Sequence, residues 1–80
     1  MTYYIATPLN TSQKQFFNEH YFPYLAPEYS DQPEGYLIQD DKLSTLPEGM
    51  DLHKIPERVM RKFNDIQEFV EAYWDGDVRI

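Results

Sequence analysis

The segment IPERVMRKFNDIQEFVEAYW (55–74) carries the most regular pattern in the chain. Its apolar residues recur at intervals of three and four, which is the period of one face of an α-helix. These residues are Ile55, Val59, Phe63, Ile66, Val70 and Tyr73. The pattern predicts either one helix over residues 56–74 or two helices broken near Asn64, because Asp65 and Glu68 are suited to cap a second helix.

The ends of this segment also carry helix signals. Pro56 is tolerated in a first helical turn, and the acid Glu57 suits the positive end of the helix dipole. Gly76 ends the helix in every interpretation. A short strand over residues 58–63, followed by a helix that begins at Asp65, is the remaining alternative.

The N-terminus predicts a strand. Residues 2–7 alternate, with Tyr3 and Ile5 on one face, and Pro8 ends the run. The strand is rich in residues that favour β-structure.

A short helix is predicted next, over residues 12–21. Ser12 and Gln15 fit a capping box at its start, and Pro23 stops it. Its buried face is expected to hold the aromatic residues Phe16, Phe17 and His20 or Tyr21.

Residues 23–35 predict an irregular segment that wraps the core, because prolines and acids alternate there with aromatic residues. Residues 35–39 then predict a strand, and residues 42–46 a partner strand that turns back at Asp40 and Asp41. That turn lacks the glycine that two-residue hairpins favour. The whole chain, residues 1–80, predicts one small α+β domain: an N-terminal strand and a hairpin form a short antiparallel sheet packed against two helices.

Composition excludes several classes of protein. The 80 residues include fourteen acids and seven bases, which give a formal net charge of −7. This balance disfavours direct nucleic-acid binding, which depends on Lys and Arg to neutralise phosphates. The absence of cysteine leaves neither disulfides nor thiolate zinc sites. With no spanning apolar run and no signal-peptide pattern, we expect a cytoplasmic protein without a membrane partner.

The sequence favours no catalytic or metal site. A serine nucleophile needs a base within reach, and none of Ser12, Ser30 and Ser44 lies in a nucleophile-elbow context. The histidines, His20 and His53, form no familiar zinc spacing. No calcium loop or phosphate-binding glycine loop is present either. We therefore expect a non-enzymatic protein with no catalytic residue, no metal and no cofactor.

Charge is distributed in bands along the chain. An acidic block between Lys14 and Lys42 contains no base, and its acids are Glu19, Glu28, Asp31, Glu34, Asp40 and Asp41. A second acidic block holds Asp65, Glu68, Glu71, Asp75 and Asp77. The basic band between them consists of Lys54, Arg58, Arg61 and Lys62. We expect this band to serve internal pairing, for example between Glu57 and Arg61 at the favourable i,i+4 spacing.

The second acidic block has a helical geometry. On a helix, Asp65, Glu68, Glu71 and Asp75 fall within an arc of about 120°. The apolar arc holds Ile66, Phe69, Val70, Tyr73 and Trp74. Successive carboxylates are about 4.5–6 Å apart along the axis, which resembles the spacing of phosphates on a nucleic-acid strand. Such an acidic ridge can occupy a Lys/Arg groove that is meant for DNA or RNA. The alternative is a solvated helix face, which is common on amphipathic helices.

Two functions from different classes fit these patterns. The first is an acidic, non-enzymatic inhibitor that docks on the basic surface of a nucleic-acid-handling protein, as a monomer or a homodimer. Its size and charge are typical of phage or mobile-element anti-defence proteins, such as anti-CRISPR or anti-restriction factors. The expected partner-binding residues are Glu28, Asp31, Glu34, Asp65, Glu68, Glu71, Asp75 and Asp77, with Tyr24 and Tyr29 as aromatic anchors.

The second function is an adaptor or assembly subunit that binds through aromatic surface, including Tyr24, Tyr29 or Trp74, with its charge serving solubility. An antitoxin-like or immunity protein would share the acidic ridge and act on a toxin nuclease.

Overall fold

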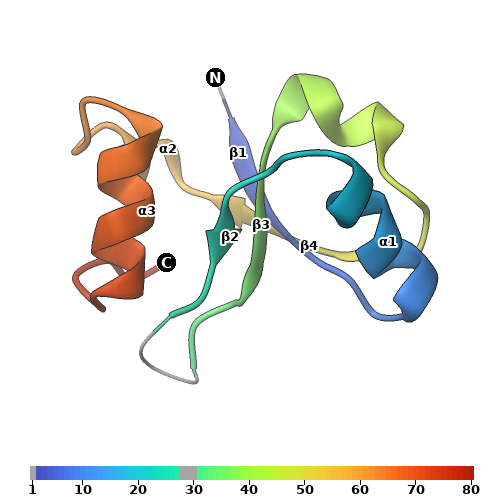
Figure 1. The fold of residues 1–80 in the computed structure, drawn as a ribbon. Helices are drawn as coiled ribbons and strands as arrows, with labels where there is room; N and C mark the ends of the chain where they lie inside the picture. The colour runs from blue at the N-terminus through green and yellow to red at the C-terminus, as the bar shows by residue number, and fades with distance from the viewer. Residues whose placement is uncertain (1, 28–30) are drawn as a thin grey trace.

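The computed structural model describes residues 2–27 and 31–80. Its sheet has four antiparallel strands in the order β2-β3-β1-β4 (Figure 1). The strands are β1 (Tyr3–Thr7), β2 (Tyr24–Leu25), β3 (Gly35–Gln39) and β4 (Asp51–Ile55). The helices are α1 (Thr11–Glu19), α2 (Glu57–Met60) and α3 (Ile66–Trp74), with a 3-10 helix η1 (Asp40–Thr45). The predicted α+β fold is confirmed.

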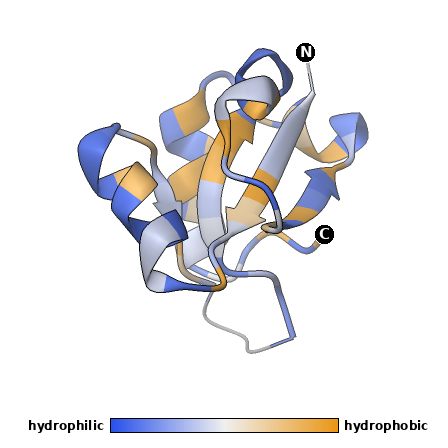
Figure 2. Ribbon diagram, turned by 90° about the vertical axis from the view of Figure 1, so that its right-hand side faces the viewer, coloured by the Kyte–Doolittle hydropathy of each residue, from blue (hydrophilic) through white to orange (hydrophobic). Residues whose placement is uncertain are grey.

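Helices cover both faces of the sheet. Figure 1 shows α3 on one side of the strands and α1 with η1 on the other. Side chains alternate along a strand, so the adjacent residues Ile5 and Ala6 of β1 enter different clusters. The α3-side cluster is Ile5, Leu25, Leu37, Ile55, Val59, Phe69, Tyr73 and Val78. The α1-side cluster is Ala6, Phe17 and Ile38. In Figure 2 the apolar stretches of the ribbon lie along the strands and on parts of the helices.

The helix α1 begins earlier than predicted. Asn10, and not Ser12, is the N-cap, and its side chain accepts a hydrogen bond from the backbone N–H of Gln13 at 2.9 Å. The side chain of Gln13 is buried, where it accepts from Leu9 N–H at 2.6 Å and donates to the carbonyl of Glu48 at 3.0 Å. The predicted capping box of Ser12 with Gln15 is therefore wrong, because the helix begins before Ser12 and Asn10 accepts from the free N–H group of its first turn.

The buried face of α1 is narrower than predicted. Phe17 is buried and Phe16 half-buried, whereas His20 and Tyr21 are exposed. The helix ends at Glu19 with His20 as its C-cap in an extended conformation. The chain therefore turns away before these two side chains can reach the sheet.

The predicted hairpin over 35–39 and 42–46 is wrong. Residues 40–45 form η1, β3 pairs with β1 and β2, and the next strand, β4, pairs with β1. Asp40 and Asp41 do not supply the positive φ that a two-residue turn needs, but they suit the positive end of a helix. The chain turns instead at Gly49, whose φ is 84°. The N-terminal strand thus lies inside the sheet, between β3 and β4.

The segment predicted as irregular contains the short strand β2. Leu25 of β2 is fully buried in the α3-side cluster, so this part of the segment packs on the core as predicted, while residues 28–30 lie outside the described residues.

The C-terminal segment forms two helices with a break at residues 61–65. Asp65 is the N-cap of α3, and its carboxylate accepts from the backbone N–H of Glu68 at 2.9 Å. Pro56 is the N-cap of α2 and not its first helical residue. The alternatives of a single helix over 56–74 and of a strand over 58–63 are wrong, because Asp65 starts a new helix. Gly76 follows α3 with a φ of 80°, as its predicted terminating role requires.

Candidate protein-binding surface

The acidic residues of α3 lie on its outer face. Phe69 and Tyr73 are buried against the sheet, so the opposite side of the helix faces solvent. The predicted ridge is exposed at each of its residues, Asp65, Glu68, Glu71 and Asp75. Asp77, which follows the ridge, is also exposed.

Local hydrogen bonds divide this ridge into two parts. Asp65 caps the helix, and the carboxylate of Glu68 accepts from the backbone N–H of Asn64 at 2.9 Å. These two carboxylates therefore stabilise the N-terminus of α3. Glu71 has one long contact at 3.4 Å, from the side-chain amide of Gln67. The C-terminal part of the ridge is thus the part whose carboxylates are available to a partner.

The end of α3 is fixed to the loop between β2 and β3. The Tyr73 hydroxyl donates to the carbonyl of Pro33 at 2.5 Å, and the Trp74 indole N–H donates to the carbonyl of Tyr24 at 2.9 Å. After the helix, the backbone N–H of Ile80 donates to the side chain of Gln32 at 3.0 Å. These contacts bring the loop that carries Asp31 and Glu34, from the first acidic block, to the end of α3, where Asp75 and Asp77 of the second block lie.

We call this end of the molecule the acidic end, defined by Glu34, Glu71, Asp75 and Asp77. Asp31 lies close to it, but its carboxylate pairs with Arg79 at 2.9 Å. Asp31 is therefore partly neutralised, although such an exposed pair contributes little to stability. The predicted site residues Glu28 and Tyr29 lie outside the described residues.

Aromatic side chains border the acidic end. Tyr24 is 37% exposed, and its hydroxyl donates to the carboxylate of Glu34. Desolvation, then the hydrogen bond and the charge of Glu34, raise the pKa of Tyr24 to about 12. Trp74 is 49% exposed, so it is not buried with the other residues of the predicted apolar arc. Its indole N–H binds the backbone of Tyr24, which holds the ring beside β2 at the surface.

The basic band lies on β4, α2 and the residues that follow α2. Glu57 and Arg61 form the predicted i,i+4 ion pair, with a distance of 3.3 Å. Within residues 2–27 and 31–80, Lys54, Arg58 and Lys62 have no ion pair. The band thus provides little internal neutralisation, contrary to the expectation from sequence.

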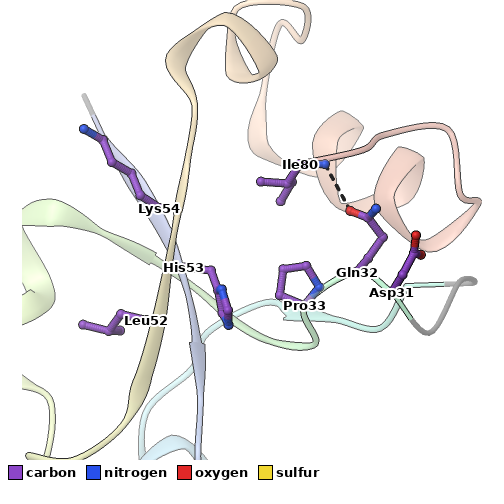
Figure 3. Close-up of a pocket in the computed structure, with 7 residues that line it drawn as sticks. All are labelled: Asp31, Gln32, Pro33, Leu52, His53, Lys54 and Ile80. Atoms are coloured by element: carbon purple, nitrogen blue, oxygen red, sulfur yellow. Dashed lines mark hydrogen bonds between the residues drawn. The ribbon is translucent and has the colours of Figure 1, made fainter.

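The described residues hold no group of three or more potential metal ligands. No helix in this part of the chain is long and apolar enough to cross a membrane. A surface groove of about 570 Å³ lies beside β4, where His53 faces Pro33 and Ile80 (Figure 3). The chain matches no protein-family model, and comparison with curated proteins and with solved structures finds no match.

The buried Tyr73 hydroxyl, which binds the carbonyl of Pro33, leads us to expect a loss of stability at alkaline pH. Burial raises the pKa of Tyr73, which is 1% exposed, from 10.0 to about 12. Because the folded state keeps a proton that the unfolded state releases, this contribution is intact below pH 10.0 and is lost as pH rises toward about 12. The expected loss is about 1.4 kcal/mol per pH unit in that window, measured by urea denaturation.

The variant Tyr73→Phe is the control for this titration. It lacks the phenol, so its free energy of unfolding should fall less steeply over the same pH range. Equal slopes for the two proteins would show that Tyr73 does not titrate in this way.

Proposed function

We propose that this protein is a non-enzymatic inhibitor that uses its acidic end to occupy a basic, nucleic-acid-binding surface of another protein. The docking of α3 onto the β2–β3 loop carries the proposal, because it gathers Glu34, Asp75 and Asp77 from two separate blocks. An anti-defence role in a phage or mobile element suits the size and charge of the chain. A cytoplasmic target is part of the same proposal.

The carboxylates of the acidic end suit it to binding a basic partner. The clustered exposed carboxylates of the acidic end attract a basic partner, and such local complementarity raises association rates. The carboxylates of Glu71 and Asp75 are one helical turn apart, about 6 Å along the axis. A groove that binds successive phosphates through Lys and Arg presents cations at comparable intervals.

The aromatic border supplies the second part of the recognition. Trp74 and Tyr24 are residue types enriched among binding hot spots, and each is partly exposed beside the acidic end. A guanidinium group of the target can stack on the Trp74 indole while a neighbouring carboxylate pairs with it.

The same two aromatic residues favour an adaptor as the second candidate function. In that case binding would depend on Trp74 and Tyr24 and would be insensitive to salt. Affinity of a Trp74→Ala variant alone does not separate the two functions, since both use this ring. The response to charge neutralisation does separate them.

A capture and competition experiment tests the inhibitor proposal. The protein is immobilised and exposed to nuclease-treated lysate of its source cells, and the retained protein is then purified and tested for nucleic-acid binding. We expect the retained protein to bind DNA or RNA and to release it when this chain is added in excess. Simultaneous binding of both, or a partner that binds no nucleic acid, would contradict the proposal.

Neutralising the acidic end is expected to weaken the complex. The variant E71Q/D75N/D77N avoids the capping residues Asp65 and Glu68, so its helix should stay intact. We expect at least a tenfold rise in Kd, about 1.4 kcal/mol, measured by calorimetry or surface plasmon resonance.

The matched control is E19Q/D41N/E48Q, which removes the same charge from exposed sites away from the acidic end. Its Kd should stay within about twofold of the wild-type value, because distant exposed charges are screened. Equal weakening by both variants would mean that net charge, and not this surface, drives binding.

A further inference from the structure

The two edges of the sheet are protected to different degrees. The β2 edge has only two residues, and the Trp74 indole N–H occupies the Tyr24 carbonyl there. The β4 edge has five residues in an uninterrupted register with β1, and Asp51 to Lys54 are exposed. In the described part of the chain, no further strand pairs with β4. A long open edge of this kind is a template for pairing with another strand.

Along an inner antiparallel strand, the backbone N–H and C=O groups of successive residues point alternately to the two neighbouring strands. This alternation shows which backbone groups of β4 face the open edge. Asp40 N–H donates to the Thr2 carbonyl at 2.9 Å, so residues 2, 4 and 6 direct their polar groups toward β3. Residues 3, 5 and 7 therefore bond β4 through their partners at 55, 53 and 51. It follows that the N–H and C=O groups of Leu52 and Lys54 point to the open edge.

The side chains of β4 can pair favourably with those of a second, antiparallel copy of β4 when the pair is centred on Leu52. In an antiparallel pair centred on this residue, Leu52 lies opposite its own copy, and Asp51 lies opposite His53 of the second copy. The Leu52 side chain is 45% exposed, so the pair would bury apolar surface. The imidazole N–H of His53 can donate to the Asp51 carboxylate, and this contact occurs twice across the two-fold axis.

The positions of the side chains permit this arrangement. Figure 3 shows Leu52 and Lys54 on one side of β4 and His53 on the other, beside the groove lined by Pro33 and Ile80. The groove has a volume of about 570 Å³, and the carboxylate of Asp31, which also lines it, is paired with Arg79. The Asp51 side chain of a second copy can therefore lie next to His53 without facing an unpaired carboxylate.

We propose that a second copy of this chain binds the β4 edge antiparallel to it, so that two sheets join into one of eight strands. Leu52 pairs with Leu52 of the other copy through its two outward backbone groups. The assembly closes as a dimer because an isologous contact uses the same edge on both copies, and the β2 edge is already occupied by Trp74. None of Glu34, Glu71, Asp75 and Asp77 lines the groove beside β4, so the acidic end stays accessible on each subunit.

Sedimentation velocity on the wild type and on two edge variants tests this proposal. The wild type is expected to dimerise between about 10 μM and about 1 mM, the range of a small interface. D51K places a lysine opposite His53, and H53D places two carboxylates opposite each other. Each variant should weaken the dimer about tenfold or more.

The controls separate local pairing from net charge. E48K changes the charge by the same amount as D51K, and Q15E by the same amount as H53D, at exposed sites outside β4. Both should dimerise like the wild type. General repulsion between chains of charge −7 would make D51K associate more tightly, which is the reverse of our expectation.

Mixing the two edge variants provides the decisive result. D51K and H53D are complementary to each other, so an equal mixture should form heterodimers in excess of random pairing, as read by native mass spectrometry. Circular dichroism of each variant checks that it is folded. A wild type that is monomeric at about 1 mM, or a dimer unaffected by D51K and H53D, would overturn the proposal. None of these variants alters the acidic end, so this outcome would leave the inhibitor function intact.

Discussion

The variant Phe69→Ala is expected to lose most of the stability of the fold. Phe69 is 0% exposed and lies at the centre of the α3-side cluster, with its ring 5.5 Å from that of Phe63 and 5.8 Å from that of Tyr73. Truncating a buried phenylalanine costs about 3–5 kcal/mol, because transfer free energy is lost and a cavity remains. Small domains have only about 5–15 kcal/mol in total.

Urea denaturation followed by circular dichroism measures this effect. The variant should show a much lower midpoint, or no folded baseline at all. Tyr21→Ala is the control, because that ring is 92% exposed and its removal should change stability by less than about 0.5 kcal/mol. A loss below about 1 kcal/mol for Phe69→Ala would mean that α3 is not packed on the sheet as described.

The variant Gly35→Ala is expected to have the second largest effect. A Cβ at this position would lie 2.3 Å from the carbonyl oxygen of Ala6 and 2.8 Å from its carbonyl carbon. Both atoms belong to the backbone of the inner strand β1, so no side-chain rotation can relieve the clash. We expect a loss of about 3 kcal/mol, at the upper end of the cost of overpacking.

Gly49→Ala provides the comparison. Gly49 has a φ of 84°, but a Cβ there meets only the side-chain nitrogen of Gln13, at 3.5 Å. Its cost should be about 1–2 kcal/mol, from the left-handed backbone alone. Both variants are measured by urea denaturation, and a larger loss for Gly49→Ala than for Gly35→Ala would contradict the close approach of β3 to β1.

Local patterns in the sequence predicted the elements whose signals are local. The alternation of residues 2–7 predicts β1. The period of residues 55–74 predicts a helical segment but leaves open whether it breaks near Asn64, and the structure shows two helices. The predicted hairpin is wrong because the partners of β3 are β1 and β2, which are distant in sequence and are selected by tertiary packing. The strand β4 has no sequence pattern that predicts it. Its residues Asp51 to Lys54 are all exposed, so buried and exposed residues do not alternate along it.

The candidate surface was predictable in part for the same reason. Helical spacing placed Glu71 and Asp75 on one exposed face, and the structure agrees. Spacing could not show that Glu68 binds the backbone of Asn64, or that Asp31 pairs with Arg79 from the far end of the chain. Helical spacing and residue type place Trp74 in the apolar arc. The sequence could not show that its indole N–H binds the carbonyl of Tyr24, fifty residues away.

The central claim is that the acidic end, and not the total charge, binds a basic partner. The most direct test is the slope of log Kd against log salt concentration for the captured target, measured for the wild type, E71Q/D75N/D77N and E19Q/D41N/E48Q. We predict a steep slope for the wild type and the control, and a clearly flatter slope for the variant of the acidic end. The same slope for all three proteins would contradict the claim.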